Sequence, residues 1–232
     1  MNNNLLKPSR LITFGCSLTY GHGLPDCSVD KLYPGPVHSN LAWPTLVSEK
    51  MNRECVNLSS PGSSNDRILN TILDFENFFT PSDHVVILWS FVHRALLFRS
   101  GGTRLDIMPY GPGVNKSAGP EEWELYYRTH DEYDLCVRSI KNIHHATCYF
   151  TSKKITVSNF YVDGRLYPMV LSPDTNTKNM LVDMKYISHR LMKIDKALDD
   201  LHPGVKSHKM MAELIYHYIH KNKSLPLALR AV

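Results

Sequence analysis

A serine near the start of the chain and an Asp/His pair near its end are the residues best suited to chemistry. Ser17 follows the apolar run Leu11–Phe14 and a glycine. A strand that breaks at Gly15 would leave the Ser17 hydroxyl at the carboxyl edge of a sheet, where open α/β sheets place their ligands. Asp199 precedes His202 by three residues, and a carboxylate at that spacing can hold the imidazole in the tautomer that accepts a serine proton. These side chains predict nucleophilic attack by serine on an ester.

Each of these residues also has a simpler interpretation. Ser17 could cap a helix that follows a strand, and an isolated Asp199 and His202 could be a helix cap and a surface histidine. The segments that carry serine, aspartate and histidine occur together and in the order expected of a catalytic triad, and this favours the catalytic interpretation. Cys16 offers a thiol next to Ser17, but we expect it to be a small buried residue. Asp200 lies one residue off the motif and is expected to be solvated.

The elements that would position these side chains follow an α/β pattern. Four short apolar runs of strand type, separated by room for helices, are Leu11–Phe14, Cys55–Leu58, Val85–Trp89 and Ile155–Phe160. Capping residues and helical spacing predict helices over 39–51, over 64–79, from 121 towards 145, and over 205–220. The stretch 100–120, rich in Gly and Pro, predicts an inserted loop or lid. We expect one domain over residues 1–232.

Composition and charge exclude several classes of function. The chain has 232 residues and a net charge of +4, and its short basic clusters at 206–209 and 220–223 are too thin for a nucleic-acid footprint. Five cysteines without CxxC spacing disfavour a disulfide framework and a structural zinc site. The amino terminus lacks the apolar core of a signal peptide, and no apolar run is long enough to span a membrane. We expect the protein to be cytoplasmic when it is synthesised. We expect neither nucleic acid nor a membrane as its partner.

Serine chemistry needs neither a metal nor a cofactor, and we expect none. Histidines elsewhere in the chain are more typical of surface or boundary positions than of metal ligands. These histidines include His144, His145, His189, His208, His217 and His220.

The candidate nucleophile and base resemble motifs of a known family, the SGNH or GDSL hydrolases. Gly15-Cys16-Ser17 matches the family's Gly-Asp-Ser block except at the central residue, and Asp199, His202 and Pro203 match its Asp-x-x-His-Pro block. The resemblance implies a flavodoxin-like three-layer α/β/α sandwich with a central parallel sheet. It also implies a Ser-His-Asp triad that hydrolyses an ester through an acyl-enzyme.

The oxyanion hole is where the resemblance is incomplete. Segment 57–65 resembles the second block, which implies that the backbone N–H groups of Gly62 and Ser17 hold the oxyanion. The third block of the family is Gly-x-Asn-Asp. At the corresponding place this chain has Leu-Trp-Ser-Phe-Val-His-Arg, residues 88–94, so the Asn side chain that donates to the oxyanion is missing. Losing one donor costs about 3–4 kcal/mol of transition-state stabilisation. An active enzyme would need a substitute donor, for which the candidates are Asn65, Ser90 and Arg94.

Arg94 has further interpretations, as a fixed charge for an acidic substrate group or as an exposed residue at a strand end. Gly-Cys-Ser together with Trp-Ser-x-x-x-Arg resembles divergent members found among tailed bacteriophages and some bacteria. That resemblance implies association with virion proteins.

The predicted substrate is a small-molecule or glycan ester, such as an O-acetyl group on a carbohydrate. The alternative is a non-catalytic binding protein or virion-associated structural protein that retains the hydrolase fold. A different enzyme architecture, the α/β-hydrolase fold, would require Gly where Thr19 stands and a wider separation of acid and histidine. We therefore favour the flavodoxin-like fold.

Overall fold

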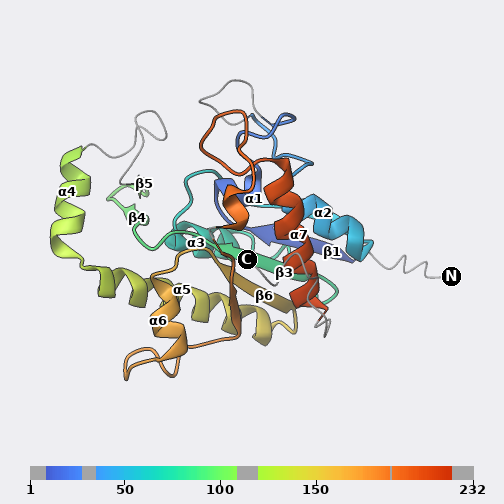
Figure 1. Ribbon diagram of the computed structural model, residues 1–232. Helices are drawn as coiled ribbons and strands as arrows, with labels where there is room; N and C mark the ends of the chain where they lie inside the picture. The colour runs from blue at the N-terminus through green and yellow to red at the C-terminus, as the bar shows by residue number, and fades with distance from the viewer. Residues whose placement is uncertain (1–8, 28–34, 109–119, 189, 221–232) are drawn as a thin grey trace.

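A five-stranded parallel sheet lies at the centre of the protein (Figure 1). The structure is a computed structural model, and it describes residues 9–27, 35–108, 120–188 and 190–220. The strand order is β2-β1-β3-β6-β7, and every neighbouring pair is parallel. The strands are β1 (Arg10–Phe14), β2 (Glu54–Asn57), β3 (His84–Trp89), β6 (Thr156–Tyr161) and β7 (Met184–Tyr186). The predicted α/β fold with a central parallel sheet is confirmed.

Two layers of helices enclose the sheet because side chains of the central strands alternate between its faces. Ile12 and Phe14 of β1 enter the core on one face, and Leu11 enters the core on the other. Helices on the first face are α3 (Asn65–Asp74) and α5 (Glu132–Ser152), and those on the second are α2 (Trp43–Met51) and α7 (Val205–Ile219). The result is the predicted three-layer α/β/α sandwich.

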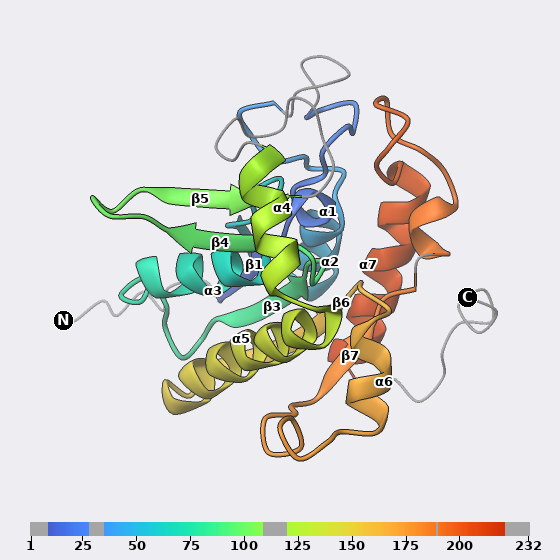
Figure 2. The same ribbon diagram turned by 90° about the vertical axis from the view of Figure 1, so that its left-hand side faces the viewer.

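A hairpin and a helix stand beside this sandwich, as Figure 2 shows. Strand β4 (Ala95–Phe98) pairs antiparallel with β5 (Arg104–Ile107), and α4 (Pro120–Thr129) follows. Residues 104–107 therefore form a strand where the sequence predicted an inserted loop or lid, whereas 109–119 lie outside the described residues. The long helix predicted from 121 is two helices, since Asp131 accepts a hydrogen bond from the Asp134 N–H and starts α5 afresh.

Three short helical segments complete the described elements. They are α1 (Ser17–Tyr20), α6 (Leu166–Leu171) and the 3₁₀ turn η1 (Leu191–Lys193). The helix predicted over 64–79 ends earlier, at Asp74, and Ser64 caps its start by accepting the Arg67 N–H. Within the described ranges, no helix combines the length and apolar character needed to cross a bilayer.

His208 is buried in the contact between α7 and α2, not at the surface as the sequence suggested. Its side chain has no exposed area, and its Nδ1 accepts a hydrogen bond from the Trp43 N–H at the start of α2. Burial lowers the pKa of His208 to about 4. Burial, with Arg53 and His220 nearby, likewise lowers the pKa of His84 to about 4. Both rings are therefore neutral in the folded protein at neutral pH.

His84 and His208 predict loss of stability in mild acid, and the lowered pKa values of His22 and His93 act in the same direction. The unfolded chain titrates His84 and His208 near 6.5 and the folded chain near 4, so the unfolded state binds more protons between these values. The free energy of unfolding should be constant above about pH 7.5 and fall below about pH 6.5, by up to about 1.4 kcal/mol per pH unit for each histidine. Urea denaturation across this range measures it. A free energy of unfolding that stays constant down to about pH 5 would contradict the prediction. The control is His145→Gln, a variant at an exposed position.

Candidate functional site

Ser17 lies at the carboxyl end of β1, in the turn that the sequence predicted. The strand ends at Phe14, and Ser17 begins α1 with 6% of its surface exposed. A Cβ atom at Gly15 would stand 2.0 Å from Thr19 Oγ1, so only glycine fits this turn. Cys16 is buried in the core between the sheet and helices α2 and α7, as expected of a packing residue.

The strand order places this turn at a topological switch. The chain passes from β1 to β2 on one side and then to β3 on the other side of β1. Connections that leave β1 and β3 in opposite directions open a crevice at the carboxyl ends of these strands. Ser17 follows β1, and the segment 90–94 follows β3, so both segments border this crevice.

Asp199 and His202 form a short hydrogen-bonded pair. His202 Nδ1 lies 2.5 Å from Asp199 Oδ2, and the Asp199 side chain is only 2% exposed. Asp199 Oδ1 also accepts the backbone N–H groups of Leu201 and His202. Burial would raise the pKa of Asp199, but these hydrogen bonds outweigh it and hold the pKa below its ordinary value. The carboxylate is therefore ionised, and it fixes the proton of His202 on Nδ1, which leaves Nε2 to accept one.

Ser17 and His202 border the same cavity. The cavity has a volume of about 240 Å³ and is also lined by Phe91, Arg94 and Lys193. Ser17 and His202 are not hydrogen-bonded to each other in the structure, an arrangement that is common in free enzymes before substrate binds. The fold thus brings the candidate nucleophile to the candidate base from opposite ends of the sequence. Asp200, in contrast, is exposed at a left-handed φ of 58° and takes no part in the pair.

His22 is a residue of the site that the sequence analysis missed. Its ring stacks on His202 with the centroids 4.5 Å apart and the planes inclined by 24°. Only 5% of His22 is exposed. Burial first, and the neighbouring His202 second, lower the pKa of His22, while Asp199 acts in the opposite direction. The neighbouring motif Gly-His-Gly at 21–23 was the available signal, because glycines on both sides allow a tight turn towards the base.

The turn that carries His22 is fitted against the Asp199 loop. Gly23 has φ of 82°, and a Cβ atom there would come within 2.7 Å of Asp199 Cγ. The Gly23 carbonyl also accepts the Leu198 N–H at 2.9 Å. A side chain at position 23 would therefore push the acid away and strain the backbone as well.

His22, Asp199 and His202 are the one group in the described ranges whose ligand atoms lie close enough together, within 4.8 Å, to hold a metal ion. The nearly parallel rings do not suit this role, because imidazole nitrogens bind a metal in the plane of the ring and these planes do not converge on a common point. Moreover, Nδ1 of His202 is already engaged by Asp199. The arrangement fits proton transfer better than metal coordination.

The segment after β2 is joined to the nucleophile turn. The Ser60 N–H donates to the Gly15 carbonyl at 3.3 Å, and Asn57 Nδ2 donates to the Thr19 carbonyl at 3.0 Å. Gly62, which follows in this segment, is buried and has φ of 82°. Gly62 is not itself among the residues that line the cavity.

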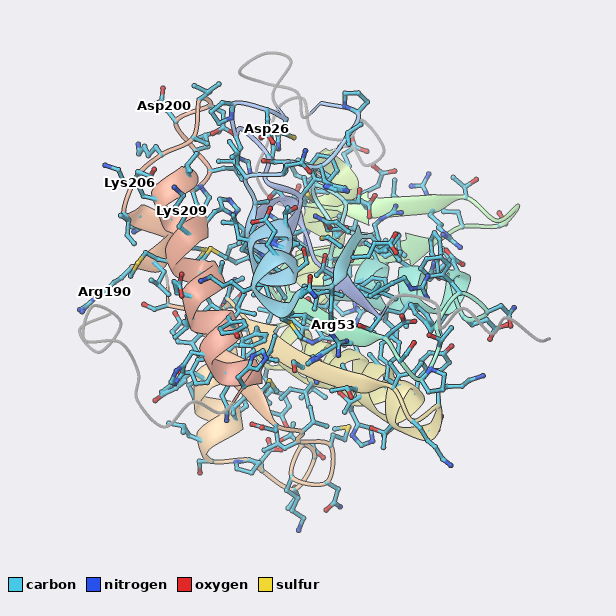
Figure 3. All side chains as sticks on the ribbon, turned by 90° about the vertical axis from the view of Figure 1, so that its right-hand side faces the viewer. Asp26, Arg53, Arg190, Asp200, Lys206 and Lys209 are labelled. Atoms are coloured by element: carbon cyan, nitrogen blue, oxygen red, sulfur yellow. The ribbon has the colours of Figure 1, made fainter. Side chains whose placement is uncertain are left out.

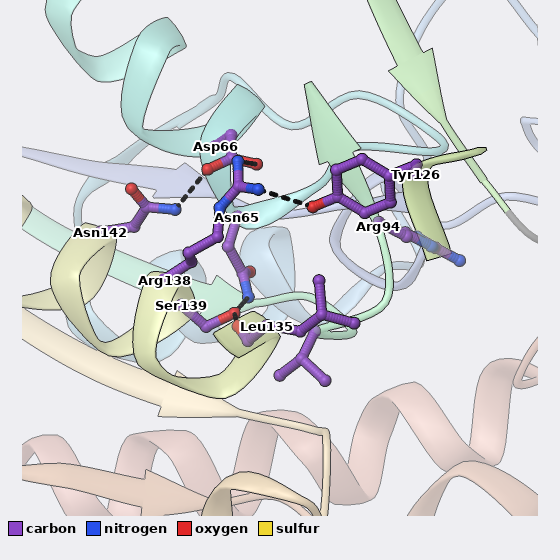
Figure 4. A pocket seen from close by; sticks show the side chains of 9 residues that line it. Asn65, Asp66, Arg94, Tyr126, Leu135, Arg138, Ser139 and Asn142 are labelled. Atoms are coloured by element: carbon purple, nitrogen blue, oxygen red, sulfur yellow. Dashed lines mark hydrogen bonds and ion pairs between the residues drawn. The ribbon is translucent and has the colours of Figure 1, made fainter. Parts of the chain in front are cut away.

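Of the three substitute donors that the sequence offered, two are already engaged. Asn65 Oδ1 accepts the Ser90 N–H, and its Nδ2 donates to the Ser90 carbonyl and to Ser139 Oγ. Figure 4 shows the Asn65 side chain pointing to Ser139, beside the cluster of Asp66, Arg138 and Tyr126. Ser90 has no exposed area, and its hydroxyl accepts a hydrogen bond from Arg94 Nη1 at 3.2 Å.

Arg94 is the candidate donor that lines the cavity. Its guanidinium lies 5.0 Å from the centroid of the Phe91 ring, and in Figure 4 the side chain points away from Asp66 and Arg138. The 90–94 segment is fixed at two points, since Asn65 accepts the Ser90 N–H and Asp163 accepts the Val92 N–H at 2.9 Å. The position of Arg94 is therefore set by buried hydrogen bonds within the fold.

Asp163 is also bound by a second arginine. Arg165 donates to both carboxylate oxygens of Asp163 and contacts His93 Nδ1 at 2.6 Å. Burial, together with Arg165 and Arg94, lowers the pKa of His93 to about 4, so this ring is neutral and can accept the Arg165 hydrogen bond. The pair Asp163–Arg165 thus anchors the segment that carries Arg94.

Comparison with known proteins gives a match in structure only. No family model matches the sequence, and no curated protein matches it. Several solved structures do match. One is a carbohydrate esterase whose active site is described as displaying divergent catalytic and non-catalytic binding functions; it has a TM-score of 0.56 and 14% identity over 95% of this chain and 71% of its own.

Two further esterases share the fold. The acetyl xylan esterase Est2A from the rumen bacterium Butyrivibrio proteoclasticus matches with a TM-score of 0.54 and 12% identity over 93% of this chain and 64% of its own. The aryl esterase of M. smegmatis matches with a TM-score of 0.54 and 8% identity over 92% of this chain and 99% of its own. At these identities the likeness concerns the fold alone, and the chain shares the three-layer α/β/α fold of these esterases.

Proposed function

We propose that the protein is a serine esterase that removes a small acyl group, with Ser17 as nucleophile, His202 as base and Asp199 as the acid that orients it. The observation that carries the proposal is the shared cavity. Ser17 and a histidine held by a buried, ionised Asp199 border the same space. The esterase structures of the same fold add support, although their identity to this chain is low.

The reaction follows from the tautomer of His202. Nε2 takes the proton from the Ser17 hydroxyl as its oxygen attacks the ester carbonyl, and Asp199 stabilises the imidazolium that forms. The imidazolium then protonates the departing alcohol and leaves an acyl group on Ser17. Water attacks this acyl-enzyme with the same base, releasing the acid and restoring Ser17. His22, whose lowered pKa keeps it neutral, can remain stacked on His202 without adding a second charge.

The oxyanion would be held by the backbone N–H group of Ser17 together with Arg94, since Gly62, the other donor that the resemblance implied, does not line the cavity. Asn65 and Ser90 are engaged elsewhere, whereas Arg94 lines the cavity and uses one of its five N–H donors on Ser90. A guanidinium fixed near the developing charge can replace the missing Asn donor of the third block.

An O-acetyl group on a carbohydrate is the substrate that we favour. A family two carbohydrate esterase from Clostridium thermocellum, solved in complex with cellohexaose, shares the fold with a TM-score of 0.51. The motif resemblance to phage proteins supports virion proteins as partners, which co-purification with phage particles would test.

A non-catalytic binding protein on the same fold is the second candidate function. The lost third-block Asn favours it, since Leu88–Arg94 offers no amide in that position. A fluorophosphonate probe separates the two functions, because it labels a serine only where a base activates the hydroxyl.

Removal of the nucleophile or the base should abolish hydrolysis. In Ser17→Ala and His202→Ala, kcat for p-nitrophenyl acetate should fall by about three orders of magnitude or more, because the two residues act as one unit. Circular dichroism checks that the variants fold, and Ser207→Ala, in a serine outside the cavity that bonds to Asp195, is the matched control. A wild-type protein that neither hydrolyses the ester nor accepts the fluorophosphonate probe would exclude the esterase.

Arg94 should act on the chemical step. We expect Arg94→Gln to lower kcat for p-nitrophenyl acetate by about 100-fold while KM changes little, the pattern of a lost oxyanion donor. Arg53→Gln is a suitable control, since Arg53 bonds to backbone carbonyls of Arg10 and Ser82 away from the cavity. An unchanged kcat in Arg94→Gln would rule out this role.

His22 should hold the ring of His202 in position. His22→Ala opens space beside the base, and we expect kcat to fall about 10-fold or more at nearly unchanged KM. His22→Phe keeps a stacked ring and should restore most of kcat, a rescue that a general loss of stability would not explain. If His22→Phe were as impaired as His22→Ala, stacking would not be the role of His22.

A further inference from the structure

The charge on the walls of the cavity is one-sided. Besides His202, its ionisable lining side chains are Arg94 and Lys193, and no Asp or Glu of the described chain lines it. Asp199 lies behind His202 with its side chain 2% exposed and does not line the cavity; its ionised carboxylate is engaged by His202 Nδ1 and by backbone N–H groups. Arg94 can stabilise the oxyanion that forms from a neutral ester, but such an ester offers no charge for Lys193 to bind.

Arg94 differs from most of the arginines in the described ranges in lacking a carboxylate partner. Seven others form ion pairs with Asp or Glu: Arg10, Arg67, Arg99, Arg104, Arg128, Arg138 and Arg165. Arg94 instead bonds to the Ser90 hydroxyl and lies over the Phe91 ring. Its charge is therefore held at the cavity without being neutralised there.

Lys193 brings the second charge from a different part of the chain. It ends η1, whose Leu191 is 1% exposed in the core, and the adjacent Met192 also lines the cavity. Lys193 itself is exposed and forms no ion pair with any described residue. The anchored turn thus places Lys193 in the wall of the cavity, with no ion pair to a described residue that would compete with a ligand.

Further charged side chains of both signs lie on the surface near the start of α7. Figure 3 shows Arg190, Lys206 and Lys209 projecting from this side, together with Asp200. Asp195 lies close to them in the chain and accepts the N–H groups of Lys206 and Ser207 at the start of α7. The charge that a ligand meets in the cavity is therefore set by Arg94 and Lys193, which line it.

We propose that the ester cleaved at Ser17 is carried by an acidic molecule, whose anionic group is bound by Lys193 with support from Arg94. The inference rests on the esterase proposed above and narrows its substrate to acyl esters of acidic saccharides. A carboxylate matches the planar guanidinium and the ammonium, and a phosphate offers the same charge and acceptor atoms.

The test uses matched substrates that differ in one charge. Release of acetate is measured from acetylated glucuronic acid, from its neutral methyl ester, and from acetylated glucose 6-phosphate, with the wild type and with Lys193→Gln. We expect the wild type to prefer an acidic substrate over the methyl ester by about 10-fold in kcat/KM, mostly through KM, with the preference shrinking as salt is added. Lys193→Gln should lose most of this preference, because its kcat/KM for the acidic substrate falls towards that for the methyl ester. The acidic substrate that is preferred identifies the anionic group.

Lys196→Gln is the matched control, because Lys196 is exposed close by in sequence but does not line the cavity. Equal kcat/KM for the acidic and neutral esters would overturn the inference, and so would a preference that survives in Lys193→Gln. In either case, hydrolysis of p-nitrophenyl acetate by the wild type would still support the proposed esterase.

A binding measurement separates the two proposals if catalysis is absent. Titration of Ser17→Ala with acetylated glucuronic acid and with its methyl ester reports recognition without turnover. Tighter binding of the acid that depends on Lys193 would support acidic recognition by a binding protein, and equal binding of the two would refute it.

Discussion

The contact between Gly23 and Asp199 is the constraint on which the site depends. The Gly23 carbonyl accepts the Leu198 N–H, and the bare Cα of Gly23 leaves room for the Asp199 carboxylate. This contact joins the turn after β1 to the loop before α7, the two segments that carry the candidate nucleophile and base. His22 can stack on His202 because the contact between Gly23 and Asp199 holds these two segments together.

The local parts of the site could be predicted from the sequence because they depend on neighbours in the chain. Asp199 and His202 are three residues apart, so one turn brings carboxylate to imidazole. The apolar runs identified β1, β2, β3 and β6 to within a residue or two. The clearest case is β3, which is buried along its whole length and is therefore almost continuously apolar. The turn at Gly15 was equally visible, as a glycine between a strand and a serine.

The parts that the sequence did not show depend on partners distant in the chain. His22 looked like any histidine until the Asp199 loop lay against it. His208 was expected near the surface, but α7 packs on α2 and the Trp43 N–H satisfies its ring. Asn65 seemed available as an oxyanion donor, whereas the fold uses it to hold the 90–94 segment. In each case the polar side chain contacts a buried partner that is distant in the sequence, so no local pattern could predict the contact.

The contact between these two segments also affects when, during synthesis of the chain, the candidate site is assembled. Translation delivers β1 and Ser17 first, and the Asp199 loop and α7 follow after the rest of the sheet. A nascent chain that has emerged only as far as α6 therefore carries a serine with neither base nor acid. On the proposed mechanism, such a chain is chemically inert towards esters around the ribosome, and hydrolysis begins only when α7 packs against α2 and the Asp199 loop reaches the turn after β1.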